Sequence, residues 1–199
     1  MKKNYVILIL ILFSGMLYPQ KAKLNEVAPR FTLRDSIEKE HSLSDYEGKI
    51  VVLEWINFEC PFVKKHYRSQ NMQSLQEKYT KKGIVWLAIC SSVKNKQGNF
   101  SNDEINRRSE KLKAKFLAYL IDENGTVGRM YGAKTTPNMY IINGSGKLVY
   151  VGGIDDKPSA DVDDIEIAKN YVSSALDELL SGEKVSIQRS TPYGCSVKY

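Results

Sequence analysis

One cysteine of this sequence occupies a position where a thiol can become reactive. Cys60 is followed by Pro61, which suits the first position of a helix because its missing N–H costs no hydrogen bond there. A thiol at a helix start faces unpaired backbone N–H groups and the positive end of the helix dipole, and both favour the thiolate. The sequence therefore predicts that Cys60 is a nucleophile whose pKa lies below the free value of about 8.5. An inert cysteine at a helix start is the alternative.

Two further cysteines are present, and their surroundings differ. Cys90 ends the apolar run IVWLAIC, where cysteine behaves as a small core residue. Cys195 follows Gly194 in a C-terminal tail without hydrophobic periodicity, so its thiol could reach Cys60 and form an internal disulfide. A tail thiol with no partner, or with an intermolecular one, is the alternative. An odd number of cysteines leaves at least one thiol outside any internal bridge.

An acidic residue lies six positions before Cys60, inside the apolar run IVVLEWI. An ionised carboxylate is costly to bury in such a strand unless other groups compensate it. One interpretation is that Glu54 is buried with a raised pKa and moves a proton for the thiol. The other is that the strand turns Glu54 to the surface or into an ion pair.

The elements around these residues follow from hydrophobic patterns. Residues 50–56 and 84–90 are typical of buried strands, and the helix expected between them, from Cys60 to the stop at Gly83, makes the two strands parallel. A capping box at Ser101 predicts another helix, and Asp163 is a candidate cap for a last helix that ends at Gly182. The other expected elements are a hairpin of residues 28–33 and 41–43, a strand at 117–121, a helix at 127–131, and a hairpin of 138–142 and 148–151.

The first twenty residues differ in kind from the rest of the 199-residue chain. Lys2 and Lys3 precede an apolar run over residues 5–17, which is typical of a signal peptide. That run reaches only about 20 Å as a helix, short of the roughly 30 Å hydrocarbon core, so a cleaved signal is favoured over an uncleaved N-terminal anchor and no stable membrane span is expected. We expect residues 1–20 to direct export to a periplasmic or other extracytoplasmic location, and residues 24–199 to form one domain.

The charge pattern argues against nucleic acid as a partner. The net charge is +6, and two of these charges are Lys2 and Lys3. The other basic residues are interspersed with acidic ones and form no tract interleaved with aromatic residues.

Several of these features together resemble the thioredoxin superfamily. They are the acid six residues before the cysteine, the Cys60-Pro61 helix start, a second strand, and Thr136-Pro137 before a hairpin. The resemblance implies an α/β thioredoxin-like fold, with a central mixed sheet flanked by helices and an N-terminal hairpin. It also implies a cis Pro137 against the thiol, substrate contacts at Pro61, Thr136 and Pro137, and proton transfer by Glu54. The residues around 28–33 and 43–49 resemble the AhpC/TSA and TlpA-like redoxin branch.

A closer similarity is to peroxiredoxin-like proteins that carry Asn-x-Cys-Pro-x-Val-Lys at the helix start and Gly-Cys-x-x-Lys-aromatic near the C-terminus. It covers about residues 26–199, with one extra residue between Asn57 and the cysteine. Two departures limit what it implies. Val63 stands where thioredoxins have a second cysteine, which excludes exchange within a C-x-x-C pair, and Leu53 and Asn57 replace the proline and peroxide-activating threonine of true peroxiredoxins.

The leading hypothesis is a thiol oxidoreductase without metal or other cofactor. Cys60 thiolate would attack a disulfide or hydroperoxide, and Cys195 or an external thiol reductant would resolve the product. The alternative is a non-catalytic binding module, or a soft-metal protein holding Cu(I) with Cys60 and His66, although a spacing of six does not put both on one helix face. The leading hypothesis requires Cys60 to be ionised at its helix start and reachable by other molecules.

Overall fold

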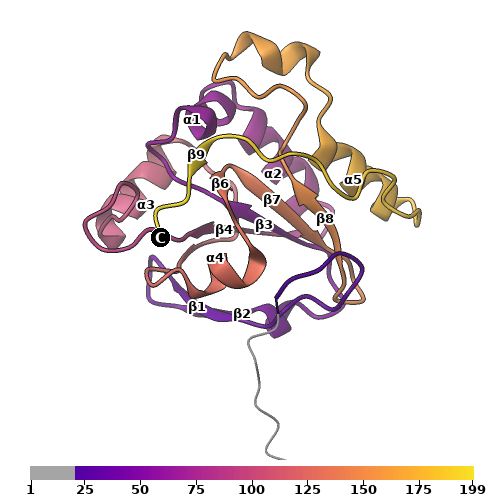
Figure 1. The fold of residues 1–199 in the computed structure, drawn as a ribbon, viewed down its shortest axis with the longest axis horizontal. Helices are drawn as coiled ribbons and strands as arrows, with labels where there is room; N and C mark the ends of the chain where they lie inside the picture. The colour runs from indigo at the N-terminus through magenta and orange to yellow at the C-terminus, as the bar shows by residue number, and fades with distance from the viewer. Residues whose placement is uncertain (1–20) are drawn as a thin grey trace, which may run out of the picture.

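A seven-stranded mixed β-sheet forms the centre of the structure, a computed structural model that describes residues 21–199 (Figure 1). The strand order is β2-β1-β5-β4-β3-β7-β8, and a separate two-stranded sheet pairs β6 with β9. The strands are β1 (Thr32–Asp35), β2 (Glu40–Ser42), β3 (Val51–Trp55), β4 (Val85–Cys90), β5 (Ala118–Ile121), β6 (Thr135–Thr136), β7 (Asn138–Ile142), β8 (Leu148–Gly152) and β9 (Cys195–Ser196).

The pairing within the large sheet is parallel in its middle and antiparallel outside. Strand β4 runs parallel to both β3 and β5, whereas β3 pairs antiparallel with β7. The predicted parallel pair is therefore confirmed, with Glu54 opposite Ala88 on β4 and Met139 on β7. All five residues of β3 are buried because the strand has a neighbour on each edge and cover on each face.

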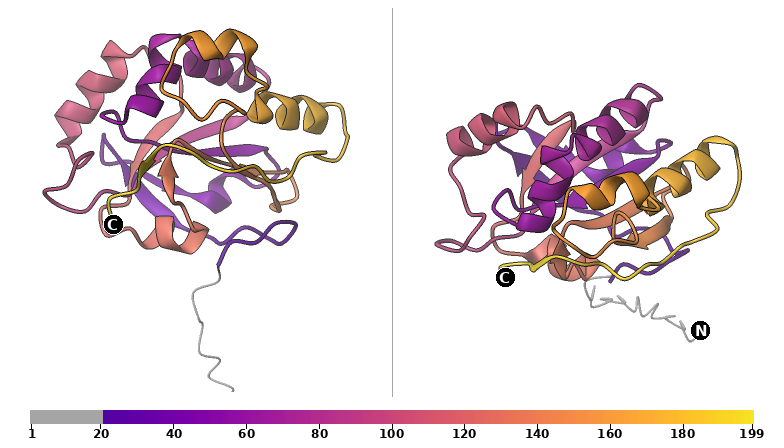
Figure 2. Two further views of the ribbon diagram at one scale, coloured as in Figure 1. Left: turned by 45° about the horizontal axis from the view of Figure 1, so that its top comes forward. Right: turned by 90° about the horizontal axis from the view of Figure 1, so that it is seen from above.

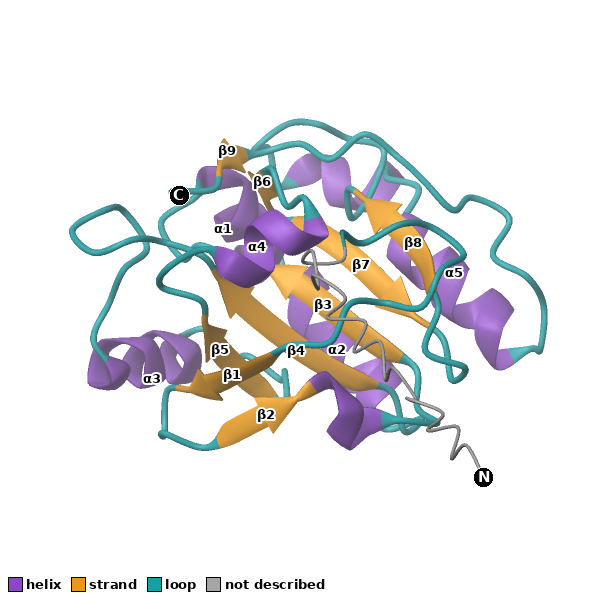
Figure 3. Ribbon diagram, turned by 60° about the horizontal axis from the view of Figure 1, so that its bottom comes forward, coloured by secondary structure: helices purple, strands orange, loops and turns teal. Residues whose placement is uncertain are grey.

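Helices cover the two faces of the sheet unequally, as Figure 3 shows. One core contains side chains of four helices, which are α1 (Pro61–Arg68), α2 (Asn71–Thr80), α3 (Asn102–Lys111) and α5 (Tyr171–Leu180). The opposite core is covered by α4 (Thr126–Tyr131) and by the segment around Ala28 and Phe31. Cys60 belongs to the first core. The α/β thioredoxin-like fold class predicted from the sequence is confirmed.

The helix expected between the two parallel strands is in fact two helices. Gln70 has a left-handed backbone with φ of +62°, which ends α1 and redirects the chain into α2. The hydroxyl of Ser69 donates to the carbonyl of Lys65 and so satisfies one of the last acceptors of α1. The sequence carries a signal for this break, because Tyr67 and Met72 are five residues apart and helical spacing requires three or four.

The start of the last helix was also predicted wrongly. Residues Asp163–Ile167 form a 3₁₀ helix, and α5 begins only at Tyr171. Its cap is Asn170, whose Oδ1 accepts from the backbone N–H of Ser173 at 2.8 Å, not Asp163. The hairpin of β7 and β8 and the Ser101 cap of α3 are confirmed, and the N-terminal hairpin is found as β1 and β2.

The expected signal peptide, residues 1–20, lies outside the described residues. Within residues 21–199, none of the helices combines the length and the apolar character that crossing a bilayer requires.

Candidate active site

Cys60 is the N-cap residue of α1, as predicted. Its backbone is extended, with φ of −66° and ψ of 125°, and Pro61 is the first helical residue. The side-chain oxygen of Asn57 accepts from the backbone N–H of Glu59 at 2.9 Å, and the Cys60 N–H donates to the Asn57 carbonyl at 3.0 Å. This turn carries the chain from the end of β3 to the helix start. It places the thiol within reach of the backbone N–H of Val63 in the first turn of α1.

The strand β6 lies directly against this thiol and is followed by Pro137. The Thr136-Pro137 peptide bond is cis, in agreement with the prediction. The protonated Cys60 thiol donates to the carbonyl of Thr136, with 2.9 Å between sulfur and oxygen. Thr136 thus contacts the Cys60 thiol directly, and Pro61 and Pro137 follow Cys60 and Thr136 in the sequence.

The C-terminal tail brings the second cysteine to the same place. Strand β9 pairs antiparallel with β6, so that Cys195 is the register partner of Thr136, and the Cys195 and Cys60 side chains are hydrogen-bonded as free thiols. Figure 2 shows the tail crossing the molecule from the end of α5 to β9. Gly194 makes this approach possible, because its φ is +131° and a Cβ there would collide with the Thr136 carbonyl oxygen.

The pKa values of the two thiols are shifted in opposite directions. Burial raises the pKa of Cys60, but hydrogen bonds from the Cys195 and Thr136 side chains and from the Val63 backbone outweigh it, and the pKa falls below its ordinary value. Burial, followed by the proximity of Cys60, raises the pKa of Cys195 to about 11. The pair therefore consists of one thiol that ionises more readily than an ordinary cysteine and one that is protonated at neutral pH.

The expectation that Cys60 is open to other molecules is wrong for this structure. The residue is 0% exposed, and β9 of the tail pairs with β6 beside it. Cys195 itself is partly exposed. In this arrangement the thiol next to Cys60 is Cys195.

Glu54 is buried, so the strand does not turn its carboxylate to the surface. Its carboxylate is 0% exposed and accepts hydrogen bonds from the Tyr67 hydroxyl at 3.0 Å, the Gln76 amide at 3.1 Å and the Trp86 indole at 2.8 Å. Burial raises its pKa to about 7, although these three donors oppose the shift. Glu54 can therefore exchange a proton near neutral pH, and Tyr67 connects it to the helix that Cys60 caps.

The remaining candidates do not extend the site. Cys90 is buried, and burial raises the pKa of its thiol, as expected of a core residue. Both ring nitrogens of His66 are engaged in hydrogen bonds, which leaves none free to join Cys60 on a metal. Among residues 21–199, no group of three or more His, Cys, Asp or Glu side chains could hold a metal ion.

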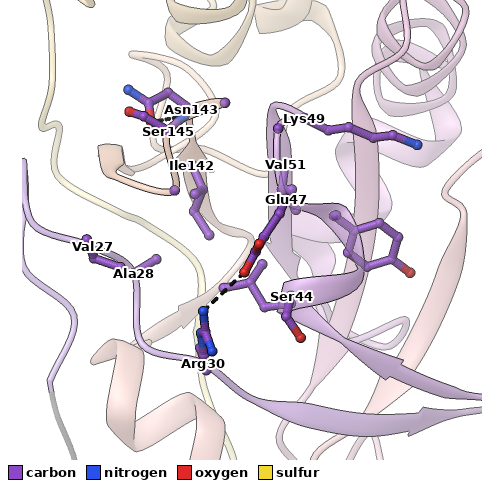
Figure 4. A pocket seen from close by; sticks show the side chains of 15 residues that line it. Val27, Ala28, Arg30, Ser44, Glu47, Lys49, Val51, Ile142, Asn143 and Ser145 are labelled. Atoms are coloured by element: carbon purple, nitrogen blue, oxygen red, sulfur yellow. Dashed lines mark hydrogen bonds and ion pairs between the residues drawn. The ribbon is translucent and has the colours of Figure 1, made fainter.

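A cavity of about 340 Å³ lies at the opposite end of β3 from Cys60 (Figure 4). It is lined by the turn before Val51 and by the hairpin after Ile142, and an ion pair of Arg30 with Glu47 crosses its mouth at 3.1 Å. Cys60 follows the other end of the same strand. This cavity is therefore separate from the thiol site.

One part of the site was not predicted from the sequence. His66, Tyr193 and Asp155 form a buried polar cluster beside the two thiols. The signal that pointed to it was weak. Tyr193 adjoins the Gly194-Cys195 pair, but sequence spacing does not show that Tyr193 meets His66 and Asp155.

Comparison with known proteins agrees with the fold. The family model described as the AhpC/TSA family matches residues 24–151. The chain belongs to the AhpC/TSA family. The chain is also 26% identical over 162 residues to the thiol-disulfide oxidoreductase ResA of Bacillus cereus. The match covers 75% of this chain and 88% of that protein.

Solved structures show the same architecture. An uncharacterized conserved protein from Geobacillus kaustophilus has a TM-score of 0.75 and 30% identity, with 89% of this chain and 92% of that chain covered. The thioredoxin domain of a thiol-disulfide oxidoreductase from Bacteroides vulgatus has a TM-score of 0.53 and 16% identity, with 74% and 98% covered, and shows the fold alone. This AhpC/TSA-family chain thus has a thioredoxin-like fold, and thiol-disulfide oxidoreductases are among its relatives.

Proposed function

We propose that this AhpC/TSA-family protein is a thiol-disulfide oxidoreductase in which Cys60 is the nucleophile and Cys195 the resolving thiol. The observation that carries the proposal is the pairing of β6 with β9, which holds a protonated Cys195 against the more acidic Cys60. A pair of thiols with different pKa values suits thiol exchange, because the thiol that ionises more readily attacks the substrate first and the protonated thiol attacks in the second step.

The proposed reaction has two exchange steps. Cys60 thiolate attacks one sulfur of a substrate disulfide, which forms a mixed disulfide with Cys60 and releases the other substrate sulfur as a thiolate. Cys195 then loses its proton and attacks the Cys60 sulfur. A Cys60–Cys195 disulfide forms, and the second substrate sulfur leaves as a thiol. An external thiol reductant returns the protein to the dithiol state, and no metal or organic cofactor takes part.

A disulfide suits this site better than a hydroperoxide does. Asn57 stands where true peroxiredoxins have their peroxide-activating threonine, and both ends of its side chain are used to hold the surrounding loops. The name of the Bacillus cereus relative, a thiol-disulfide oxidoreductase, points in the same direction. Attack on a hydroperoxide would give a Cys60 sulfenic acid and an alcohol, with Cys195 resolving the sulfenic acid and releasing water.

Substrate entry in this proposal begins with the tail. Because Cys60 is 0% exposed, β9 has to leave β6 before a protein disulfide can approach. Its departure frees the edge of β6, where Thr136 and Pro137, together with Pro61, would contact the incoming chain. A two-residue strand is short enough for such exchange.

Glu54 is proposed to supply and accept the proton that these steps move. A carboxyl with a pKa of about 7 holds its proton about half of the time at neutral pH, which suits general acid–base work. Tyr67, which donates to Glu54, is the hydrogen-bonded connection between this carboxyl and α1.

We also propose that the protein works outside the cytoplasm, with residues 1–20 acting as its export signal. An oxidising compartment would permit the Cys60–Cys195 disulfide to persist between turnovers. Cell fractionation together with N-terminal sequencing of the protein from its native host tests this. A mature chain that still begins at Met1 in the cytosol contradicts it.

The proposed activity is tested by rapid mixing of the reduced protein with a disulfide-bonded peptide and, separately, with hydrogen peroxide. Wild type and Cys90→Ser should react with the peptide at similar rates, faster than with peroxide, whereas Cys60→Ser should lose the reaction. Equal rates for Cys60→Ser and wild type would reject the proposal and favour a non-catalytic binding module.

A further inference from the structure

We infer that a buried chain of hydrogen bonds through His66, Tyr193 and Asp155 positions Cys195 against Cys60. The inference rests on the proposed function, since it assigns these residues to the resolving step of that reaction. It makes them positioning residues, which act through the tail and do not touch a substrate.

The chain of contacts connects three segments that are distant in sequence. His66 on α1 lies 3.1 Å from the Tyr193 hydroxyl through its Nε2. The Tyr193 hydroxyl donates to Asp155 Oδ1 at 2.6 Å, and the same oxygen accepts from the backbone N–H of Lys157 at 2.9 Å. At the other end, the Asn71 amide lies 2.9 Å from His66 Nδ1.

These contacts admit one consistent arrangement of hydrogens. Burial, and then the charge of Lys65, lower the pKa of His66 to about 3, so the ring is neutral and carries one hydrogen. The Tyr193 hydroxyl has a single hydrogen, which Asp155 accepts, so His66 Nε2–H must donate to the Tyr193 oxygen. His66 Nδ1 is then the acceptor for Asn71. Each of these donors has an acceptor, so the hydrogen bonds fix the orientation of the Tyr193 side chain as well as its position.

The same tyrosine ring packs against the helix that Cys60 caps. It meets the ring of Phe62 edge-on, with 5.9 Å between centroids, and the Nζ of Lys65 lies 5.8 Å from its centre. Phe62, Lys65 and His66 all belong to the first two turns of α1. Tyr193 is therefore held by the helix whose N-terminus presents Cys60.

Tyr193 is well placed to control Cys195 because only Gly194 separates them. Two residues span at most about 7 Å, so fixing the ring confines the thiol to a small volume. Within described residues 186–199, Tyr193 is the only side chain that is buried. The tail is thus held in two ways, by the backbone pairing of β9 with β6 and by the buried side chain of Tyr193.

The cluster is costly to bury, which argues that it does more than fill space. Lys65 is 1% exposed and donates to the carbonyl of Lys157 at 3.0 Å, and His66 is 0% exposed. Asp155 Oδ2 is buried without a hydrogen-bond partner among the described residues, 3.9 Å from His66 Nε2. Apolar side chains would pack here at lower cost, but they would not fix a direction for the tail.

The test measures how strongly the fold favours the Cys60–Cys195 disulfide. Full-length wild type and Tyr193→Phe are equilibrated with reduced and oxidised glutathione, quenched with acid and alkylated, and the disulfide is quantified by mass. Without the hydroxyl, the ring can still pack against α1, but the hydrogen bonds that orient Tyr193 and the tail are lost. We expect the equilibrium constant for the internal disulfide to fall roughly tenfold in Tyr193→Phe.

Four further variants separate positioning from ordinary stabilisation. Tyr131→Phe removes another buried tyrosine hydroxyl, which donates to the Pro29 carbonyl at 2.7 Å and not to the tail. This variant should leave the equilibrium constant for the disulfide unchanged. Asp155→Asn keeps an acceptor oxygen and should remain close to wild type, whereas Asp155→Ala should match Tyr193→Phe. The double variant of Tyr193→Phe and Asp155→Ala should lose no more than the larger single loss.

The outcomes distinguish this inference from the proposed function. If wild type forms no Cys60–Cys195 disulfide at any glutathione ratio, the proposed function fails and the inference fails with it. If wild type forms the disulfide and Tyr193→Phe has the same equilibrium constant, the positioning role alone is overturned. A loss in Tyr131→Phe equal to that in Tyr193→Phe would also overturn it, because it would indicate general destabilisation.

Discussion

At the scale of single residues, the asymmetry between the two thiols depends on one hydrogen bond. Cys195 donates to Cys60, and this bond is the largest of the contributions that lower the pKa of Cys60 against the effect of burial. We predict that Cys195→Ala raises the pKa of Cys60, whereas Cys195→Ser, which keeps a donor, changes it less. The ultraviolet absorbance of the thiolate as a function of pH measures this. An unchanged or lower pKa in Cys195→Ala would contradict it.

A second residue-scale prediction concerns Glu54 and stability. Its folded-state pKa of about 7 lies above the ordinary value of 4.5, so the folded protein retains a proton that the unfolded chain has lost between these values. The contribution of Glu54 to the free energy of unfolding therefore falls as pH rises from 4.5 to 7, by about 3 kcal/mol in all.

Urea unfolding of wild type and Glu54→Gln at pH 5 and pH 8 isolates this contribution. Glutamine keeps the shape and cannot ionise, so the variant should gain stability relative to wild type at pH 8 and not at pH 5. A difference between the two proteins that does not change with pH would show that Glu54 is already ionised at pH 5.

At the scale of elements, the site is the meeting point of α1, β6 and β9. The start of α1 was predictable, because Cys60-Pro61 is a local signal with its own physical reason, whereas the cis Pro137 after β6 was predicted only through the resemblance to the thioredoxin superfamily. The parallel strands β3 and β4 were also predictable, since continuous apolar runs fit strands covered on both faces. The sequence thus located the cysteine at the helix start, the acid within the buried strand and the cis proline.

The third element could not be derived in the same way. A strand of two residues has no period to detect, and its pairing with β6 joins segments that are distant in sequence. Sequence reasoning allowed Cys195 to reach Cys60 but not to cover it, which is why the exposure of Cys60 was predicted wrongly. The role of Tyr193 depends on His66 and Asp155 together, and no local pattern relates these three residues.

A glycine substitution tests this element directly. Gly194→Ala should push β9 away from the Thr136 carbonyl, and we predict that Cys60 in the reduced protein then reacts with iodoacetamide at least roughly tenfold faster, since opening the tail no longer limits access. Gly182→Ala is the matched control. Its φ is also positive, at +77°, but nothing lies within 4 Å of the added Cβ, so it carries backbone strain without the collision. Equal rates in all three proteins would mean that the tail does not limit access to Cys60.

At the scale of the whole molecule, the tail connects the end of the chain to its first long helix. The segment from α5 to the C-terminus crosses the edge of the fold and joins β6 beside α1 (Figure 1). Further contacts hold it beyond β9, including the Tyr199 hydroxyl, which donates to the Ala133 carbonyl at 2.8 Å. A disulfide at this point would close most of the domain into one loop.

That closure should be measurable as stability. A bridge across so long a loop restricts the unfolded chain, and we predict that the oxidised protein is more stable to urea than the reduced protein by about 2 to 5 kcal/mol. The same comparison in Cys195→Ser, which cannot form the bridge, should show no difference. If the oxidised wild type were less stable than the reduced form, the bridge would have to distort the fold described here.

The most direct test of the account is to map the disulfide that forms when the reduced, full-length protein meets a mild disulfide oxidant such as oxidised glutathione. Peptide mass mapping after rapid alkylation should find Cys60 joined to Cys195 within one molecule, with Cys90 free. Cys60 and Cys195 both free, or joined only to other partners, would contradict the claim that these two thiols form the working redox pair.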